Sequence, residues 1–370
     1  MKRYGILSIK PRIDPRNAPS FESLYGLVGQ NTGNLLFTNA VWSQIAGEKE
    51  RVGFTFDPEA LNDRLDGLII PAANWLSPLV DFSELGRLVD RLRIPVVLIG
   101  LGAQDANFSG EIAVPAGTRL FVEAVSARSA AISVRGSYTK HLLNGMGIDN
   151  VIVTGCPSLC HDFRHFREFD RVHVRFEKGL LHSTRFSADH EPFAHTPSVH
   201  REIFRLAFAH DVDLLIQSER EEMYSLTQLD PAGLLDERLK RLLLEIYGAP
   251  DWHILSSYFH KHCQLFFDVD NWAKALERYD YVFGTRLHGT IMALNSGVPA
   301  FMLHHDSRTR ELCEFSAIPS ADAKSFKLSP GSIKRAVEST HFGAFYRRRE
   351  QIKHVYQKFL QLNDLQMNHF

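Results

Sequence analysis

The segment YVFGTRLHGT, residues 281–290, places an arginine and a histidine between two glycines, directly after an apolar run. Arginine presents a planar fork of N–H donors that matches carboxylate and phosphate oxygens. Histidine exchanges a proton near neutral pH. A strand that leads through a glycine turn into a helix holds such side chains at the helix N-terminus, where anions are favoured. Arg286 and His288 are therefore the first candidates for anion binding and proton transfer.

Two glycine loops earlier in the chain are candidates to line the same site. The loop GQNTGN, residues 29–34, carries Asn31 and Asn34 before a helical pattern, which favours an anion or a polar ligand oxygen. A tight turn with Asn34 as the helix N-cap explains this loop equally well. The loop GLGAQ, residues 100–104, offers Gly102 and Gln104 after an apolar run. It lacks the third glycine and the ribose-binding acid of a dinucleotide site, which excludes NAD.

Two arginine-bearing segments follow apolar runs in the same way. The segment VRGS, residues 134–137, places Arg135 at the start of a helical pattern. The segment HHDSRTRE, residues 304–311, contains His305, Asp306 and Arg308, which suit a phosphate or an acceptor. The structural alternatives are a salt-bridged surface arginine for the first segment and a capping cluster for a helix starting near Thr309 for the second.

These segments need a scaffold that brings strand ends together, and the apolar pattern predicts one. Short apolar runs alternate with helical patterns, which indicates an α/β fold with mainly parallel sheets. Strands are expected at residues 4–8, 67–70, 95–99, 131–134, 151–154, 172–174, 212–216, 265–267, 281–283 and 300–303. Helices are expected at residues 34–45, 138–143, 199–210, 234–246, 272–279, 291–295 and 347–362.

The alternating pattern breaks at residues 157–171, in a polar and aromatic stretch. This break predicts an N-terminal Rossmann-like domain at residues 1–165, which contributes Arg135 and the acceptor side. A C-terminal Rossmann-like domain at residues 166–330 would carry the RLHG turn, and helices at residues 331–370 would pack back on the body. Because ligands bind beyond the carboxyl ends of parallel strands, the candidate residues should meet between the two domains.

Composition excludes several classes of protein. The 42 basic and 43 acidic residues leave no bulk charge that would attract nucleic acid. Four cysteines suit a reducing cytosol, and the spacing of Cys156, Cys160, His161 and His165 matches no usual zinc site, so no metal is expected. We expect a cytoplasmic protein because neither a signal peptide nor a membrane-spanning run is present. The basic run at residues 347–349 allows peripheral contact with acidic lipid, although a packed C-terminal helix is favoured.

Four stretches together resemble the polysaccharide pyruvyltransferase family: GQNTGNLLFTNAV, IPVVLIGLGAQ, ISVRGSYTKHLLNGMGIDNVIVTGCPSL and YVFGTRLHGTIMALNSGVPAFMLHHDSRTREL. They fall in family order and span residues 25 to 318. The resemblance implies two Rossmann-like domains facing across a cleft, similar to GT-B glycosyltransferases, and phosphoenolpyruvate as donor. It also places Arg286, Leu287 and His288, with Gly289 beside them, at the donor site and makes Arg135 a second anion-binding arginine.

A mechanism follows for such a donor. Two arginines and a helix N-terminus offset the donor's charge without metal or cofactor, and His288 protonates the methylene carbon. A hydroxyl of a sugar or glycan, which is free, nucleotide-linked or lipid-linked, then attacks and phosphate leaves. A nucleotide-sugar glycosyltransferase on the same architecture and a catalytically inactive carbohydrate-binding homologue are the alternatives.

Overall fold

A computed structural model describes residues 1–104, 112–161, 163, 168–185, 187–189, 198–229 and 234–368 of the chain. Every pairing between the named strands in these ranges is parallel. Five of the twelve strands in these ranges are buried along their whole length, as parallel sheets require when both faces are covered. The predicted α/β class with parallel sheets is therefore confirmed.

The first half of the chain builds a parallel sheet in the order β2-β1-β3-β4. Its strands are β1 (Arg3–Leu7), β2 (Glu48–Val52), β3 (Gly67–Pro71) and β4 (Val96–Ile99). A further pair, β5 (Ile132–Val134) and β6 (Val151–Val153), joins it through a parallel bridge between Leu101 and Val134. The loops after β3, β4 and β5 thus leave the same edge of this half.

The second half builds a parallel sheet in the order β12-β11-β10-β7-β8-β9. Its strands are β7 (Gly179–His182), β8 (Asp213–Ile216), β9 (Cys263–Leu265), β10 (Tyr281–Gly284), β11 (Ala300–His304) and β12 (Ser320–Asp322). The strand order reverses between β7 and β10, which is where open α/β sheets usually bind ligands. The RLHG turn directly follows β10.

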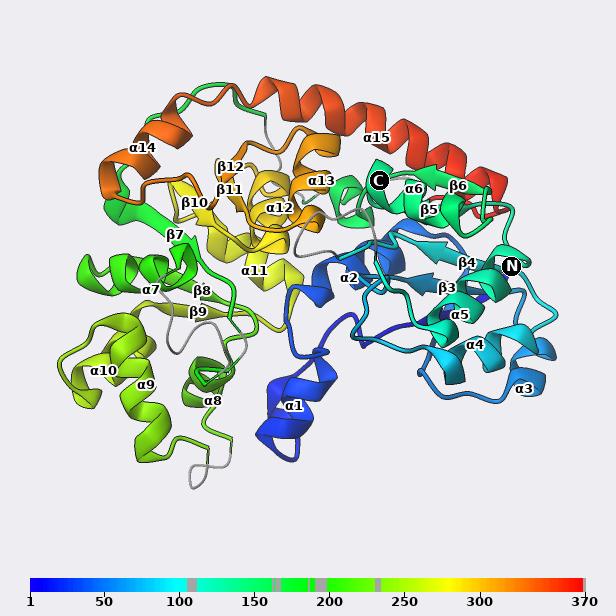
Figure 1. Cartoon of the computed structure of the whole chain (residues 1–370), viewed down its shortest axis with the longest axis horizontal. Helices are drawn as coiled ribbons and strands as arrows, with labels where there is room; N and C mark the ends of the chain where they lie inside the picture. The colour runs from blue at the N-terminus through cyan, green and yellow to red at the C-terminus, as the bar shows by residue number, and fades with distance from the viewer. Residues whose placement is uncertain are drawn as a thin grey trace.

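Helices connect these strands in both halves (Figure 1). The helices of the first half are α1 (Phe21–Leu27), α2 (Asn34–Gln44), α3 (Pro58–Asn62), α4 (Ser83–Asp90), α5 (Ala116–Ser126) and α6 (Ser137–Gly145). Those of the second half are α7 (Val199–Ala209), α8 (Arg220–Thr227), α9 (Glu237–Tyr247), α10 (Trp252–His262), α11 (Val269–Leu276), α12 (Leu287–Asn295), α13 (Ser307–Ser316) and α14 (Pro330–Glu338). Short 3₁₀ helices lie at η1 (Pro15–Asn17), η2 (Pro157–Cys160) and η3 (Phe176–Lys178).

The C-terminal helix α15 (Gly343–Leu362) crosses from the second half to the first, and is drawn in red in Figure 1. Arg349, from the basic run, is buried and donates to the carbonyls of Leu159 (2.8 Å) and His161 (3.0 Å). Beyond the helix, Met367 pairs antiparallel with Ile45. One of the three basic side chains proposed for lipid contact therefore packs inside the protein.

The structure corrects several expected elements. Residues 172–174 form no strand, because the backbone N–H of Val174 donates to the Glu338 carboxylate (3.1 Å) and not to a neighbouring strand. The second half begins its sheet at β7 instead. The strand β9 begins and ends two residues earlier than the expected strand at 265–267. Elements that were not predicted are strands β2 and β12 and helices α1, α3, α4, α5, α8 and α10. The domain boundary near residue 165 stays a prediction, because residues 164–167 lie outside the described ranges.

Candidate active site

The turn after β10 joins the carboxyl ends of β10 and β7. Gly284 has φ 153°, and a Cβ there would lie 1.7 Å from the carbonyl oxygen of His182. Only glycine fits such a close approach of two backbones. The backbone N–H of Arg286, the N-cap residue of α12, then donates to Nδ1 of His182 (2.9 Å). Gly284, one of the two glycines noted in this turn, therefore allows the ends of the two central strands β7 and β10 to approach closely.

Arg286 uses its guanidinium to fasten this turn to β8. Its Nε donates to the carbonyl of Ser183 (2.9 Å), and its Nη2 donates to the carbonyl of Arg185 (2.7 Å). The same Nη2 forms an ion pair with Glu219 at 2.5 Å and contacts Ser218 Oγ. Arg286 is 7% exposed and contributes positive charge beside His288, but two of its nitrogens already bind the protein.

His288 lies where the two halves of the chain meet. Its ring packs against Phe37 of α2 with centroids 5.4 Å apart, and its Nε2 lies 3.7 Å from Sγ of Cys156. Burial lowers the pKa of His288 well below 6.5, and the charges of Arg135, Arg308 and Arg286 lower this pKa further. The ring is therefore neutral at neutral pH when no ligand is bound.

Arg135 is a buried cation whose hydrogen-bond partners in the described chain are neutral. Its Nε donates to the carbonyl of Gly100 (2.9 Å), Nη1 to Asn74 Oδ1 (3.1 Å) and Nη2 to the carbonyl of Ala72 (3.3 Å). Only 2% of Arg135 is exposed, and it makes no ion pair with a described residue. Burial accordingly lowers the pKa of Arg135. The charge of Glu311 opposes this shift, but the Glu311 carboxylate is bonded to Thr139. A buried cation without a carboxylate in ion-pair contact is costly, so the position suits an anionic ligand.

The loop after β4 supports Arg135. A Cβ on Gly102 would lie 3.1 Å from Cδ of Arg135 and 3.0 Å from Asn74 Oδ1, so glycine leaves room for the guanidinium. The backbone N–H of Gln104 donates to the carbonyl of Leu76 (2.9 Å), which ties the loop to the segment after β3. Glycine is therefore needed at position 102 to leave space for Arg135. The ligand-lining role predicted for the Gln104 side chain stays a prediction.

The loop before α2 reaches across to the second half. Asn31 accepts the backbone N–H of Gly33 (2.8 Å), and a Cβ on Gly33 would lie 2.5 Å from Gln217 Nε2 and 3.2 Å from His288 Cβ. The N-cap of α2 is Gly33, so the alternative that made Asn34 the N-cap is wrong. The Asn34 amide instead donates to the carbonyls at positions 28 and 29, both at 3.1 Å, and closes its own loop.

The segment after β11 caps the N-terminus of α13, and Arg308 pairs with the capping residue Asp306. Asp306 caps α13 by accepting the backbone N–H of Thr309 (2.8 Å), as the structural alternative expected, although α13 begins at Ser307. The other Asp306 oxygen pairs with Arg308 Nη2 at 3.1 Å and lies 3.7 Å from Nε2 of His305. Burial lowers the pKa of His305 to about 4. Arg308 Nε is buried without a partner among the described residues.

Several residues at this junction were not identified from the sequence. Glu311 of α13 accepts both the backbone N–H of Thr139 (2.9 Å) and its hydroxyl (3.1 Å), and so caps α6 from the opposite half. Gln217, at the end of β8, is 1% exposed, and its Oε1 has no partner in the described chain. Cys156 was considered as a metal ligand and set aside, and its contact with His288 was not foreseen. Their partners lie too far away in sequence for a local pattern to reveal them.

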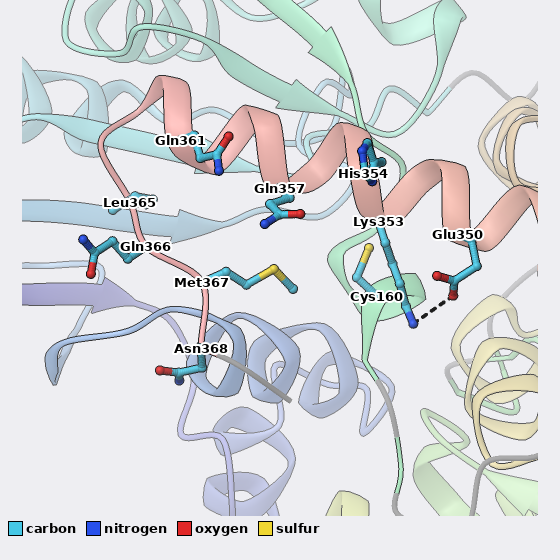
Figure 2. A pocket seen from close by; sticks show the side chains of 10 residues that line it. All are labelled: Cys160, Glu350, Lys353, His354, Gln357, Gln361, Leu365, Gln366, Met367 and Asn368. Carbon is cyan, nitrogen blue, oxygen red and sulfur yellow. Dashed lines mark ion pairs between the residues drawn. The ribbon is translucent and has the colours of Figure 1, made fainter.

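A roomy pocket lies away from this junction. About 640 Å³ of space opens between α15 and the C-terminal segment, lined by side chains such as Lys353, Gln357 and Met367 (Figure 2). None of the candidate residues lines it. Across the described ranges, no cluster of three His, Cys, Asp or Glu side chains is placed to hold a metal ion. No helix in the described chain is both long and apolar enough to cross a bilayer.

Comparison with known protein families assigns the chain to one of them. A family model described as polysaccharide pyruvyl transferase matches residues 31–307, which include the RLHG turn and Arg135. The chain belongs to the polysaccharide pyruvyl transferase family and is therefore a transferase. No curated protein matches the chain significantly.

Among solved structures, S. aureus MnaA with UDP is 12% identical over 100% of both chains, with a TM-score of 0.45. The UDP-GlcNAc 2-epimerase of Neisseria meningitidis bound to UDP-GlcNAc is 11% identical over 98% of this chain and 99% of that one, with a TM-score of 0.45. The glycosyltransferase SnogD from Streptomyces nogalater is 11% identical over 97% of this chain and 96% of that one, with a TM-score of 0.36. The family assignment rests on the family match alone.

Proposed function

We propose that the protein transfers the enolpyruvyl group of phosphoenolpyruvate to sugar hydroxyls and forms a pyruvate ketal on a glycan. Beside family membership, the observation that carries this proposal is the buried Arg135, which makes no ion pair with a described residue. The carboxylate and phosphate of the donor would supply the missing negative charge. The proposal needs no metal, because arginines of both halves offset the donor's charge.

Arg308 is the proposed second contact with the donor. Arg308 belongs to α13 and Arg135 follows β5, and the charges of both lower the pKa of His288. Phe37 forms a shared wall, since its ring lies 5.4 Å from the His288 centroid and 5.9 Å from Arg135 Cζ. In this proposal Arg286 acts mainly by positioning the RLHG turn, because Nε and Nη2 already bind the segments that follow β7 and β8. Leu287 and Gly289 line the turn.

His288 is the proposed general acid. The arginines hold it neutral before the donor binds, and the donor's negative charge would offset them and raise the pKa of His288. The imidazolium then gives its proton to the methylene carbon, and a sugar oxygen bonds to C2. A second sugar hydroxyl displaces phosphate at C2 and closes the ketal. Of the two hydroxyl protons lost, one restores the histidine and the other leaves with phosphate.

The acceptor would meet the donor from the loops around α13 and α2. His305 and Asp306 are proposed to orient acceptor hydroxyls, and the His305 ring is supported by His200, whose ring centroid is 4.8 Å away. Asn31 and Gln104 remain proposed lining residues from the other half. The acceptor is a sugar or a glycan, free or lipid-linked, in the cytoplasm.

The donor assignment is tested by thermal unfolding without added metal, with millimolar phosphoenolpyruvate or with UDP. A ligand at about 100 times its Kd stabilises a protein by roughly 2.7 kcal/mol, which is visible as a shifted melt. We expect phosphoenolpyruvate to shift the wild type but not Arg308→Gln or Arg135→Gln. Arg87→Gln, an exposed helical arginine paired with Glu84, is the matched control and should keep the shift. A shift with UDP alone would overturn the proposal in favour of a nucleotide-sugar enzyme.

A further inference from the structure

A buried thiol touches the proposed acid from the opposite half of the chain. Cys156 follows β6 and is the N-cap residue of η2. It is fully buried, and its Sγ lies 3.7 Å from Nε2 of His288, 132 positions away. The contact therefore exists only when the two halves are folded against each other.

The turn that carries this thiol is held in place on two sides. Gln44 of α2 donates its amide to the carbonyl of Pro157 (3.0 Å), and Asn295 donates its amide to the carbonyl of Ser158 (2.6 Å). Asn295 is the last residue of α12, the helix whose second residue is His288. Helix α12 therefore carries the His288 ring at one end and binds the turn that bears the Cys156 sulfur at the other. This arrangement fixes the distance between the ring and the sulfur.

The hydrogen bonds around Cys156 indicate which group donates in its contact with His288. The hydroxyl of Ser158 donates to Sγ of Cys156 (3.0 Å). The thiol has one hydrogen of its own, and His288 Nε2 is the other partner within reach. A thiol that donates to Nε2 makes this nitrogen an acceptor, and a neutral imidazole then carries its proton on Nδ1. None of the hydrogen bonds between described residues uses Nδ1.

We propose that Cys156 is a positioning residue that fixes His288 in the Nδ1–H tautomer and turns Nδ1 toward the donor. The inference rests on the proposed role of His288 as the acid. The charged groups facing the ring are Arg135, Arg308 and Arg286, and Phe37 covers one side of it. A carboxylate in place of the thiol would offset these arginines and hold an imidazolium before the donor arrives. A thiol orients the ring and leaves its protonation to the donor's charge.

The tautomer is read directly by long-range ¹H–¹⁵N spectra of protein labelled in its histidine rings, at pH 8 and without donor. The His288 signals are those that disappear in His288→Asn. We expect the wild type and Cys156→Ser, which keeps a donating group, to show a protonated Nδ1. Cys156→Ala should shift His288 toward the Nε2–H form, whereas Cys263→Ala, another buried thiol on β9, should leave it unchanged. An Nε2–H wild type, or no difference between wild type and Cys156→Ala, overturns the proposal.

Turnover gives an independent measure. Groups that orient metal-binding histidines are typically worth roughly 10–100-fold in activity. By analogy, Cys156→Ala should lower kcat about tenfold while its Kd for phosphoenolpyruvate stays near the wild-type value. Cys156→Ser should recover most of kcat. The tautomer is measured without any substrate, so failure of phosphoenolpyruvate to bind would overturn the proposed function and not the assignment of Cys156. If Cys156→Ala does not fold, the proposal is still tested by the wild-type and Cys156→Ser spectra. Both must show a protonated Nδ1, and an Nε2–H form in the wild type overturns the proposal.

Discussion

Replacing Gly136 with alanine tests how the two halves are joined. Gly136 precedes α6, and a Cβ at this position would lie 2.1 Å from Cγ and 2.3 Å from Cδ of Glu311. The backbone itself permits alanine, because φ is −168° and therefore extended. The substitution must push the Glu311 carboxylate away from the N-terminus of α6, where it accepts both the backbone N–H and the hydroxyl of Thr139.

The expected cost follows from these contacts. Overpacking a well-packed site costs roughly 1–3 kcal/mol, and moving a carboxylate away from a helix N-terminus removes roughly 0.3–1 kcal/mol more. Burial raises the pKa of Glu311, while its bonds to Thr139 oppose that rise, so the displaced carboxylate also loses the groups that favour its charged form. The free energy of unfolding should fall by about 1–4 kcal/mol in Gly136→Ala.

Urea unfolding at pH 7 measures this change as a lowered midpoint. Gly145→Ala is the matched control at the other end of α6, where a Cβ meets nothing within 4 Å. It should be neutral or stabilising by about 0.5–1 kcal/mol, as glycine disfavours helix interiors. In a Glu311→Ala background the clash is absent, and Gly136→Ala should cost less than about 1 kcal/mol. Equal costs in both backgrounds would refute the reasoning.

Three further predictions concern the ends of β7 and β10 and the histidines near them. Gly284→Ala should cost more than about 4 kcal/mol and abolish soluble protein, whereas Gly26→Ala, in open space, should not; comparable yields of the two would contradict the close approach to His182. Burial lowers the pKa of both His182 and His200 to about 3, while the unfolded rings bind protons below about pH 6.5. Stability should therefore fall with decreasing pH below 6.5, by up to about 1.4 kcal/mol per pH unit for each ring. Denaturation midpoints measured across this pH range should decrease less steeply with falling pH in His200→Asn than in the wild type. An unchanged pH dependence would show that His200 does not contribute to the loss of stability. Phosphoenolpyruvate should raise the pKa of His288 in an NMR titration, and saturation without a rise would remove the proposed coupling between donor charge and protonation.

The sequence predicts much of this molecule because the relevant signals are local. Apolar runs followed by helical patterns are enough to indicate parallel sheets, and most predicted strands overlap observed ones. The exceptions have a physical cause. The charged β2 has only Val52 buried, so it carries no apolar signal. Residues 172–174 carry that signal, but their backbone bonds to a side chain. The RLHG turn was also recognisable from the sequence, because its glycines lie within a few residues of the arginine and the histidine. Gly284 is required there by the close approach of the His182 backbone.

The sequence by itself determined the family, the α/β class and the residue types available to bind an anion. Only the tertiary structure decided which residues meet. Arg286 and Arg135 look alike as isolated arginines, yet one pairs with Glu219 and the other makes no ion pair with a described residue. The contacts of Glu311 with Thr139 and of Cys156 with His288 join positions 172 and 132 residues apart. Local patterns do not encode such pairs, because the packing of two separately patterned sheets sets which loops come together.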